Sequence, residues 1–199
     1  MARTSTQRLL ATQVLLLLTL AAVVLSDGRA LEGVPGLLAQ VLGFLLVVGG
    51  TLWRIWTSAF IAGRKEVDLL ESGPYARCRH PLYFGSFVVG LGIGLTTRSV
   101  ILTAVLPIAL GAGFWVAIRS EDRLLADRHG AAWATFQQRV PAFWPRIGAA
   151  RGPGHWKVDL RVFRKAFLDA ASVLSVWLLV LLLDTLRMQG AWQAWFELP

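Results

Sequence analysis

Residues 72–85 read SGPYARCRHPLYFG, a proline-punctuated, arginine-flanked junction that leads straight into an apolar segment. Pro81 suits the first turn of a helix, where the amide that proline lacks would have no intrahelical partner. The sequence after it stays largely apolar as far as Leu95. This junction therefore predicts a polar loop at the edge of a membrane helix.

The composition of the whole chain agrees with a membrane setting. Of its 199 residues, 55% are hydrophobic and only 16% are charged, and the mean hydropathy is +0.57. A soluble domain contains about 45–50% apolar residues. A helix needs roughly 20 apolar residues to cross the hydrocarbon core. Candidate spans are Leu9 to Leu25, Leu37 to Trp53, Leu82 to Ile118 and Ala166 to Leu186.

The run from Leu82 to Ile118 is interrupted near Thr96-Thr97-Arg98, so we interpret it as two spans joined by a tight turn. Lipid offers no hydrogen bonds, and helices satisfy their own backbone amides. The expected fold class is therefore all-α, a polytopic membrane protein with about five transmembrane helices plus interfacial amphipathic helices. We expect one membrane domain over 1–199, in which 146–199 holds a basic interfacial segment and an additional C-terminal transmembrane helix.

The first apolar run has a competing interpretation. Arg3 and Arg8 before an apolar segment resemble a secretory signal. The run is longer than the usual 7–15 residues of a signal core, however, and no Ala-x-Ala cleavage site follows it. We therefore expect a retained helix.

The basic residues predict the orientation in the membrane. If the amino terminus is cytosolic, all of the 20 lysines and arginines except Arg29, Arg98 and Arg187 fall on the cytosolic side. This is a strong positive-inside bias. The net charge of +8 could suggest nucleic acid, but no nucleic-acid-binding motif accompanies it. We expect contact with anionic lipid headgroups, and no nucleic-acid partner.

A second polar segment covers residues 119–145 and falls on the same predicted side. Its apolar residues recur at near-helical spacing, which predicts an amphipathic interfacial helix bent around Gly130 and ended by Pro141. Glu121 and Asp122 lie at the membrane edge of the preceding span, where carboxylates need cationic neighbours. Both conspicuous polar segments would thus face the cytosol, where a soluble cofactor is available.

The ordered combination of these motifs resembles the isoprenylcysteine carboxyl methyltransferase and phospholipid methyltransferase superfamily, which consists of integral membrane enzymes. The resemblance covers roughly residues 50–145, the expected methyltransferase core. It rests on Gly73-Pro74-Tyr75, Arg79-His80-Pro81-Leu82-Tyr83-Phe84-Gly85, Gly92 and Gly94, Glu121-Asp122, His129-Gly130 and Val140-Pro141. The chain departs from the family where Asp122, His129, Trp133 and Phe136 replace the usual glutamate, phenylalanine and tyrosines.

The resemblance implies S-adenosylmethionine as cofactor and a site for it. Arg79, His80, Pro81 and Tyr83 would begin the helix that lines the cofactor. Gly92 and Gly94 would allow its close approach, although they could equally be helix-packing contacts. Glu121 and Asp122 would bind its polar groups. This set is the predicted cofactor-binding site.

The acceptor implied by the resemblance is lipid-like or prenylated. Carboxyl O-methylation of an isoprenylcysteine-like substrate is favoured, and amine N-methylation of a phospholipid is the alternative. Arg77 and Arg139 are the candidate catalytic residues, because a guanidinium matches a carboxylate or phosphate with two hydrogen bonds. They could also be headgroup contacts.

Other chemistries have weaker support. Cys78 is the only cysteine, and His80, His129 and His155 lack the spacing of metal ligands, so no metal site is expected. A non-enzymatic membrane carrier or assembly subunit stays open as the rival interpretation. The oligomeric state is not predicted.

Overall fold

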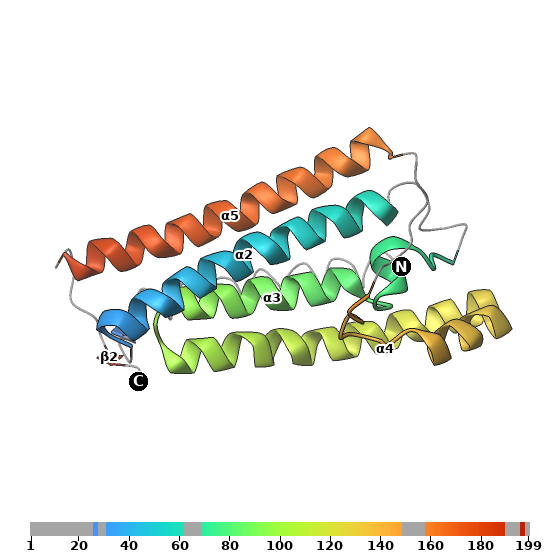
Figure 1. Cartoon of the computed structure of the whole chain (residues 1–199), viewed down its shortest axis with the longest axis horizontal. Helices are drawn as coiled ribbons and strands as arrows, with labels where there is room; N and C mark the ends of the chain where they lie inside the picture. Colours follow the sequence, from blue (N-terminus) through green and yellow to red (C-terminus); the bar gives the residue numbers. More distant parts are fainter. Residues whose placement is uncertain (1–25, 28–30, 62–68, 149–157, 190–195, 198–199) are drawn as a thin grey trace.

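The structure is a computed structural model that describes residues 26–27, 31–61, 69–148, 158–189 and 196–197. Its described part is built from long helices lying side by side (Figure 1). The α-helices are α2 (Gly33–Ile61), α3 (Pro81–Thr96), α4 (Val100–Arg139) and α5 (Leu160–Met188). A 3-10 turn, η1 (Gly73–Ala76), precedes α3. Two short strands, β1 (Ser26–Asp27) and β2 (Phe196–Glu197), pair in parallel.

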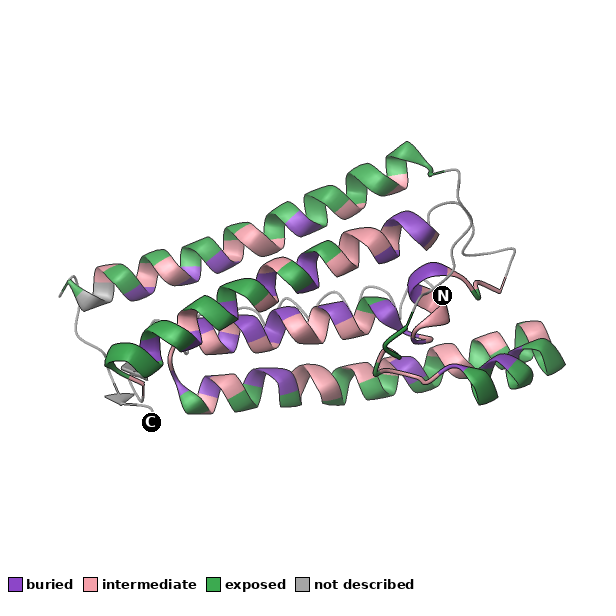
Figure 2. Cartoon of the chain, in the orientation of Figure 1, coloured by how far each residue is buried: buried purple, intermediate pink, exposed green. Residues whose placement is uncertain are grey.

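Helix α3 lies between α2 and α4 and packs closely on both (Figure 1). A Cβ added at Gly85 would meet the Gly50 carbonyl oxygen at 3.2 Å, and one added at Gly92 would meet that of Gly43 at 2.7 Å. The residue numbers rise along α3 while those of the facing residues fall along α2, so α2 and α3 are antiparallel. Small residues let membrane helices approach closely, and Figure 2 shows that α3 is mostly buried or half-buried.

The predicted turn within the third apolar run is confirmed. Helix α3 ends at Thr96, and α4 begins after Ser99. The Ser99 hydroxyl caps α4 by accepting a hydrogen bond from the Leu102 amide at 3.3 Å. Next to it, Arg98 has a φ of 59° and forms an ion pair with Asp184 of α5 at 2.8 Å. The turn therefore both reverses the chain and attaches α5 to the bundle.

The helices support a multi-pass membrane protein. Within the described residues, α2, α4 and α5 are long and apolar enough to cross a membrane, whereas α3 has only 16 residues. The predicted total of five spans is therefore not confirmed. The run Leu9 to Leu25 lies outside the described residues. Much of α5 is exposed (Figure 2), including large apolar side chains such as Leu168 and Leu182, as expected for a surface that contacts lipid.

Helix α4 changes direction at Gly130, where φ is 50° and ψ is −121°. The Arg79 side chain donates hydrogen bonds both to Asp122 and to the Val140 carbonyl oxygen. A straight helix would separate these two acceptors by about 27 Å, so the chain turns back at Gly130. The bend predicted at Gly130 is confirmed, but the segment is a helical hairpin that continues from the span, not a separate interfacial helix.

The two polar segments lie at the same end of the bundle. The Arg79 amide donates to the Pro141 carbonyl oxygen at 2.9 Å, and the His80 amide donates to that of Ala142 at 3.1 Å. Farther along, the Arg146 amide donates to the Arg77 carbonyl oxygen at 3.0 Å. The loop before α3 is thus held directly against the chain that follows α4. The cytosolic orientation of this end stays a prediction.

Candidate active site

The loop 72–80 is shaped by close backbone packing before α3 begins. Gly73 has a φ of 60°, and a Cβ there would lie 2.3 Å from the Phe60 ring of α2. Only glycine fits both the backbone conformation and the space. Together with the hydrogen bonds to residues 141–146, this packing fixes Arg79 and His80 at the start of α3.

His80 and Arg79 meet the acidic pair of α4. The Nε2 atom of His80 lies 2.7 Å from Oδ1 of Asp122, and Nη1 of Arg79 donates to Oδ2 of Asp122 at 3.0 Å. The His80 side chain is 3% exposed, so its contact with Asp122 is well shielded from water. Both carboxylate oxygens of Asp122 are thus engaged by protein cations or donors.

Glu121 is the more accessible of the two acids, with 31% of its side chain exposed. The Tyr83 hydroxyl donates to its Oε2 atom at 3.3 Å, and Nδ1 of His80 lies 3.7 Å from the same oxygen. The Tyr83 ring packs against Phe114 of α4, with centroids 5.1 Å apart. The structure therefore brings Arg79, His80, Tyr83, Glu121 and Asp122 into one cluster.

Trp133 and Gln137, which were not predicted as site residues, complete the surroundings of Arg79. The guanidinium lies 5.5 Å from the centre of the Trp133 ring, a cation–π contact. In the hydrogen-bonding orientation of the Gln137 amide, its oxygen accepts from Nη1 of Arg79 at 2.8 Å and from Nε1 of Trp133 at 3.0 Å. Both residues follow the reversal at Gly130, so the returning arm of the helical hairpin contacts the Arg79 guanidinium. In the sequence, the only signal for such a contact was that Trp133 and Phe136 stand where the family has tyrosines.

Pro81 begins α3 as predicted, and its carbonyl oxygen accepts a hydrogen bond from Nε1 of Trp53 at 2.8 Å. This contact joins the first turn of α3 to α2. The His80 side chain makes no hydrogen bond that caps the helix. The positive end of α3 therefore lies beside the acidic cluster without a side-chain cap.

Gly92 and Gly94 do not join this cluster. A Cβ at Gly92 would lie 2.8 Å from the Val47 amide nitrogen, and one at Gly94 would lie 2.7 Å from Cα of Thr103. Backbone atoms of α2 and α4 thus fill the space beside both glycines. This geometry favours the helix-packing alternative over cofactor approach.

The two candidate catalytic arginines differ in their surroundings. Arg139 is 58% exposed and forms an ion pair with Glu71 at 2.8 Å. Arg77 is half-buried, and its guanidinium lies 5.8 Å from the centre of the Trp56 ring. Its Nε atom is buried and has no hydrogen-bond partner in the part of the chain that the structure describes. Of the two arginines, Arg77 therefore has a buried N–H donor that could bind a ligand, whereas Arg139 is already paired with Glu71.

Burial also controls the ionisation of the loop. It raises the pKa of the Cys78 thiol to about 12, an effect partly offset by the His80 backbone amide. It likewise raises the pKa of Tyr75, to which the negative charge of Glu121 contributes further. Both groups are neutral at physiological pH, so neither is set up as a nucleophile or base.

An apolar helical bundle with an arginine–histidine–carboxylate cluster at one end defines a multi-pass membrane protein with a candidate polar site. A sequence model of the isoprenylcysteine carboxyl methyltransferase (ICMT) family matches residues 35–127, which include every member of that cluster. Over these residues the chain is similar to this family.

Three curated relatives were found. The chain is 40% identical over 142 residues to the cobalt-zinc-cadmium resistance protein CzcN of Cupriavidus metallidurans, covering 71% of this chain and 63% of the relative. It is 38% identical over 137 residues to the nickel-cobalt-cadmium resistance protein NccN of Alcaligenes xylosoxydans xylosoxydans, covering 69% and 62%. It is 28% identical over 92 residues to protein-S-isoprenylcysteine O-methyltransferase of Schizosaccharomyces pombe, covering 45% and 39%.

These alignments span less than two thirds of each relative's own length. No solved structure matches the chain.

Proposed function

We propose that this protein is an S-adenosylmethionine-dependent membrane methyltransferase that acts on a lipid-like acceptor. The similarity of residues 35–127 to the ICMT family supports the reaction class. The observation that carries the proposal is the contact between the loop before α3 and the acidic pair of α4, with His80 Nε2 at 2.7 Å from Asp122. It joins the two motifs on which the family resemblance rests.

The chemistry of these side chains suits the cofactor. S-adenosylmethionine, when bound, supplies an electrophilic methyl group on a sulfonium, and it also carries an ammonium and a carboxylate. Glu121 offers a partly exposed carboxylate to the cationic groups. Arg79 and the uncapped start of α3 offer positive charge to the carboxylate. Asp122, with both oxygens engaged, positions Arg79 and His80 in this proposal and does not itself bind the cofactor.

For the acceptor, we propose carboxyl O-methylation of an isoprenylcysteine-like substrate. Arg77, whose buried Nε has no hydrogen-bond partner among the described residues, is better placed than the exposed Arg139 to hold an acidic group. A carboxylate is already a nucleophile and needs no base. N-methylation of a phospholipid amine, the alternative, would require a group that removes a proton.

The decisive experiment is transfer of label from methyl-tritiated S-adenosylmethionine to a total lipid extract by the purified full chain. We expect a labelled lipid product that alkali cleaves, as an ester requires. Label that resists alkali would point to N-methylation. The variant Glu121→Gln should lose transfer, whereas Asp127→Asn on the exposed surface of the same helix should retain it.

Cofactor binding distinguishes this enzyme from the rival, a carrier or assembly subunit that catalyses no reaction. We expect saturable binding of S-adenosylhomocysteine in detergent, lost in His80→Ala while the protein stays folded. Absence of binding and of transfer by the intact protein would favour the rival.

A part in resistance to divalent transition metals is a second candidate function, favoured by the names of two relatives. A deletion strain complemented with the parent or with Glu121→Gln would be grown in cobalt, zinc and cadmium salts. Resistance restored by the parent alone would make methyl transfer part of that role. Equal restoration by both would separate resistance from the chemistry.

A further inference from the structure

Two cavities meet on helix α5. The larger, about 580 Å³, is lined by Leu160, Arg161, Phe163, Arg164 and Phe167. The smaller, about 150 Å³, lies between α5 and α2 and is lined by Val48, Thr51, Leu52, Ile55, Phe167, Ala170, Ala171 and Leu174. Phe167 lines both cavities, so the two lie next to each other along α5, and we call them together the groove.

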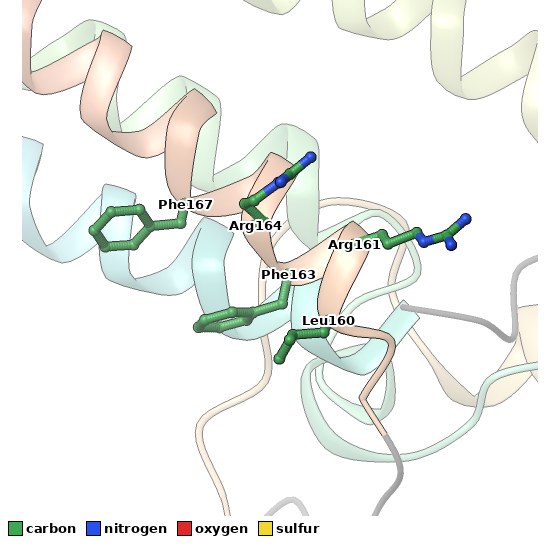
Figure 3. Close-up of a pocket in the computed structure, with 5 residues that line it drawn as sticks. All are labelled: Leu160, Arg161, Phe163, Arg164 and Phe167. Carbon is green, nitrogen blue, oxygen red and sulfur yellow. The ribbon is translucent and has the colours of Figure 1, made fainter.

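The outer part of this groove is cationic and aromatic. Figure 3 shows the guanidinium groups of Arg161 and Arg164 on one side of α5 and the rings of Phe163 and Phe167 on the other. Both arginines are exposed, and neither forms an ion pair within the described ranges.

The nearby carboxylates are already engaged. Asp159 accepts hydrogen bonds from the backbone amides of Arg161, at 2.8 Å, and Val162, at 3.4 Å. Asp169 forms an ion pair with Arg54 of α2. The two arginines therefore give the start of α5, beside the outer cavity, a net positive charge.

The inner part of the groove is apolar and narrow. Its α5 wall includes the small residues Ala170 and Ala171, which leave room between the helices. Thr51, on the α2 wall, has a buried hydroxyl oxygen with no hydrogen-bond partner among the described residues. The surrounding α5 surface exposes Leu168 and Leu178, so the groove opens on the face expected to contact the bilayer.

We propose that this groove binds an anionic glycerophospholipid of the membrane. Its headgroup phosphate pairs with Arg161 and Arg164, and one acyl chain passes Phe167 into the cavity between α2 and α5. Cationic side chains at the start of a membrane helix attract anionic headgroups, and the apolar cavity can hold an acyl chain. The arginines and the α5 wall of this site lie beyond residue 127, where the family match ends, and the site does not depend on the proposed methyl transfer.

The test compares binding of phosphatidylglycerol and phosphatidylcholine with identical acyl chains to the purified full chain, by native mass spectrometry. Two arginines near a headgroup predict about 30-fold tighter binding of the anionic lipid. The variant R161Q/R164Q should reduce phosphatidylglycerol binding to the phosphatidylcholine level. Retention of charge in R161K/R164K should preserve most of the preference.

Two further variants isolate the site. Ala171→Phe fills the inner groove and should weaken both lipids, while R123Q/R128Q removes equal charge from exposed positions on α4 and should change neither. The proposal is overturned if the parent shows no preference, if R161Q/R164Q or Ala171→Phe binds like the parent, or if R123Q/R128Q loses as much. Displacement of the lipid by glycerol phosphate at equal concentration would also overturn the proposal, since the acyl chain would then contribute nothing to binding.

Discussion

The Nε2 atom of His80 lies 2.7 Å from Oδ1 of Asp122, a contact that joins residues 42 positions apart in the chain. The second oxygen of Asp122 is held by Arg79 at 3.0 Å. Glu121, the adjacent residue, is more exposed and receives a hydrogen bond from Tyr83. Two neighbouring carboxylates therefore have different surroundings, and this difference predicts different consequences when each is replaced.

Asp122→Ala should destabilise the fold, because it leaves the buried His80 and the largely buried Arg79 without their acceptor. Removing one partner of a fully buried pair costs about 3–5 kcal/mol, and partial exposure reduces this to about 2 kcal/mol here. Glu121→Gln should change stability by less than about 0.5 kcal/mol but weaken S-adenosylhomocysteine binding about tenfold. Thermal unfolding in detergent and equilibrium binding measure the two effects.

Asp127→Ala is the matched control, since Asp127 is an exposed acid on the same helix. It should leave both measurements unchanged. If Glu121→Gln instead lowers stability as much as Asp122→Ala while binding persists, the division of roles between the two acids is wrong.

Gly92 gives a second prediction, which separates helix packing from cofactor approach. A Cβ at this position would lie 2.7 Å from the Gly43 carbonyl oxygen and 2.8 Å from the Val47 amide nitrogen, and neither backbone atom can move without shifting α2. Gly92→Ala should therefore cost about 2 kcal/mol of unfolding free energy. The folded fraction should bind S-adenosylhomocysteine as the parent does.

The control is Gly113→Ala, on α4, where an added Cβ meets nothing within 4 Å in the part of the chain that the structure describes. Alanine favours a helix over glycine by up to about 1 kcal/mol, so this variant should be at least as stable as the parent. An unchanged unfolding midpoint for Gly92→Ala together with a tenfold loss of affinity would restore the cofactor role.

Much of the fold could be predicted because apolar runs and their interruptions are local signals. The turn at Thr96-Thr97-Arg98 and the helix beginning at Pro81 both lie where the sequence indicated them. The reversal at Gly130 was predicted only as a bend. An amphipathic pattern is the same whether the helix continues or folds back, so periodicity alone could not show that residues 131–139 return along α4.

The cluster contains several of the predicted site residues, but their arrangement could not be predicted. Motif order indicated His80, Glu121 and Asp122, and the structure places them in contact. Which acid faces His80 depends on helix rotation, and the sequence does not define this. The packing of Trp133 on Arg79 depends on how far the chain turns back at Gly130, and the sequence indicated only a bend there.

Cys78 is expected to be chemically inert in the folded protein. The side chain is fully buried, and burial raises the pKa of the thiol from 9.0 to about 12. The thiolate is the reactive form, so maleimide labelling at pH 8 should be about 1,000-fold slower than in the unfolded chain. Rapid labelling of folded protein would contradict the burial of this loop.

The same raised pKa predicts a pH dependence of stability. Below pH 9 the thiol is protonated in both states, and its contribution is fully present. Between pH 9 and about 12 the unfolded chain loses the proton while the folded protein keeps it, so the free energy of unfolding should fall as pH rises. Cys78→Ala should show a shallower fall over this window than the parent. Cys78 also contributes to the raised pKa of Tyr75, so its removal lowers that pKa as well and makes the fall shallower in the same direction.

Gly130 provides the sharpest test of the helical hairpin, because its φ of 50° and ψ of −121° suit glycine alone. No atom of the described residues lies within 4 Å of an added Cβ, so Gly130→Ala acts through backbone strain, with an expected cost of about 1–3 kcal/mol. Gly130→Asn should be no better, since asparagine tolerates the left-handed helical region but not this ψ. Gly111→Ala, also unobstructed but within the regular helix, should cost nothing. Thermal unfolding and limited proteolysis across 131–139 measure the effect, and parent-like behaviour of both Gly130 variants would show that the chain does not reverse in this conformation.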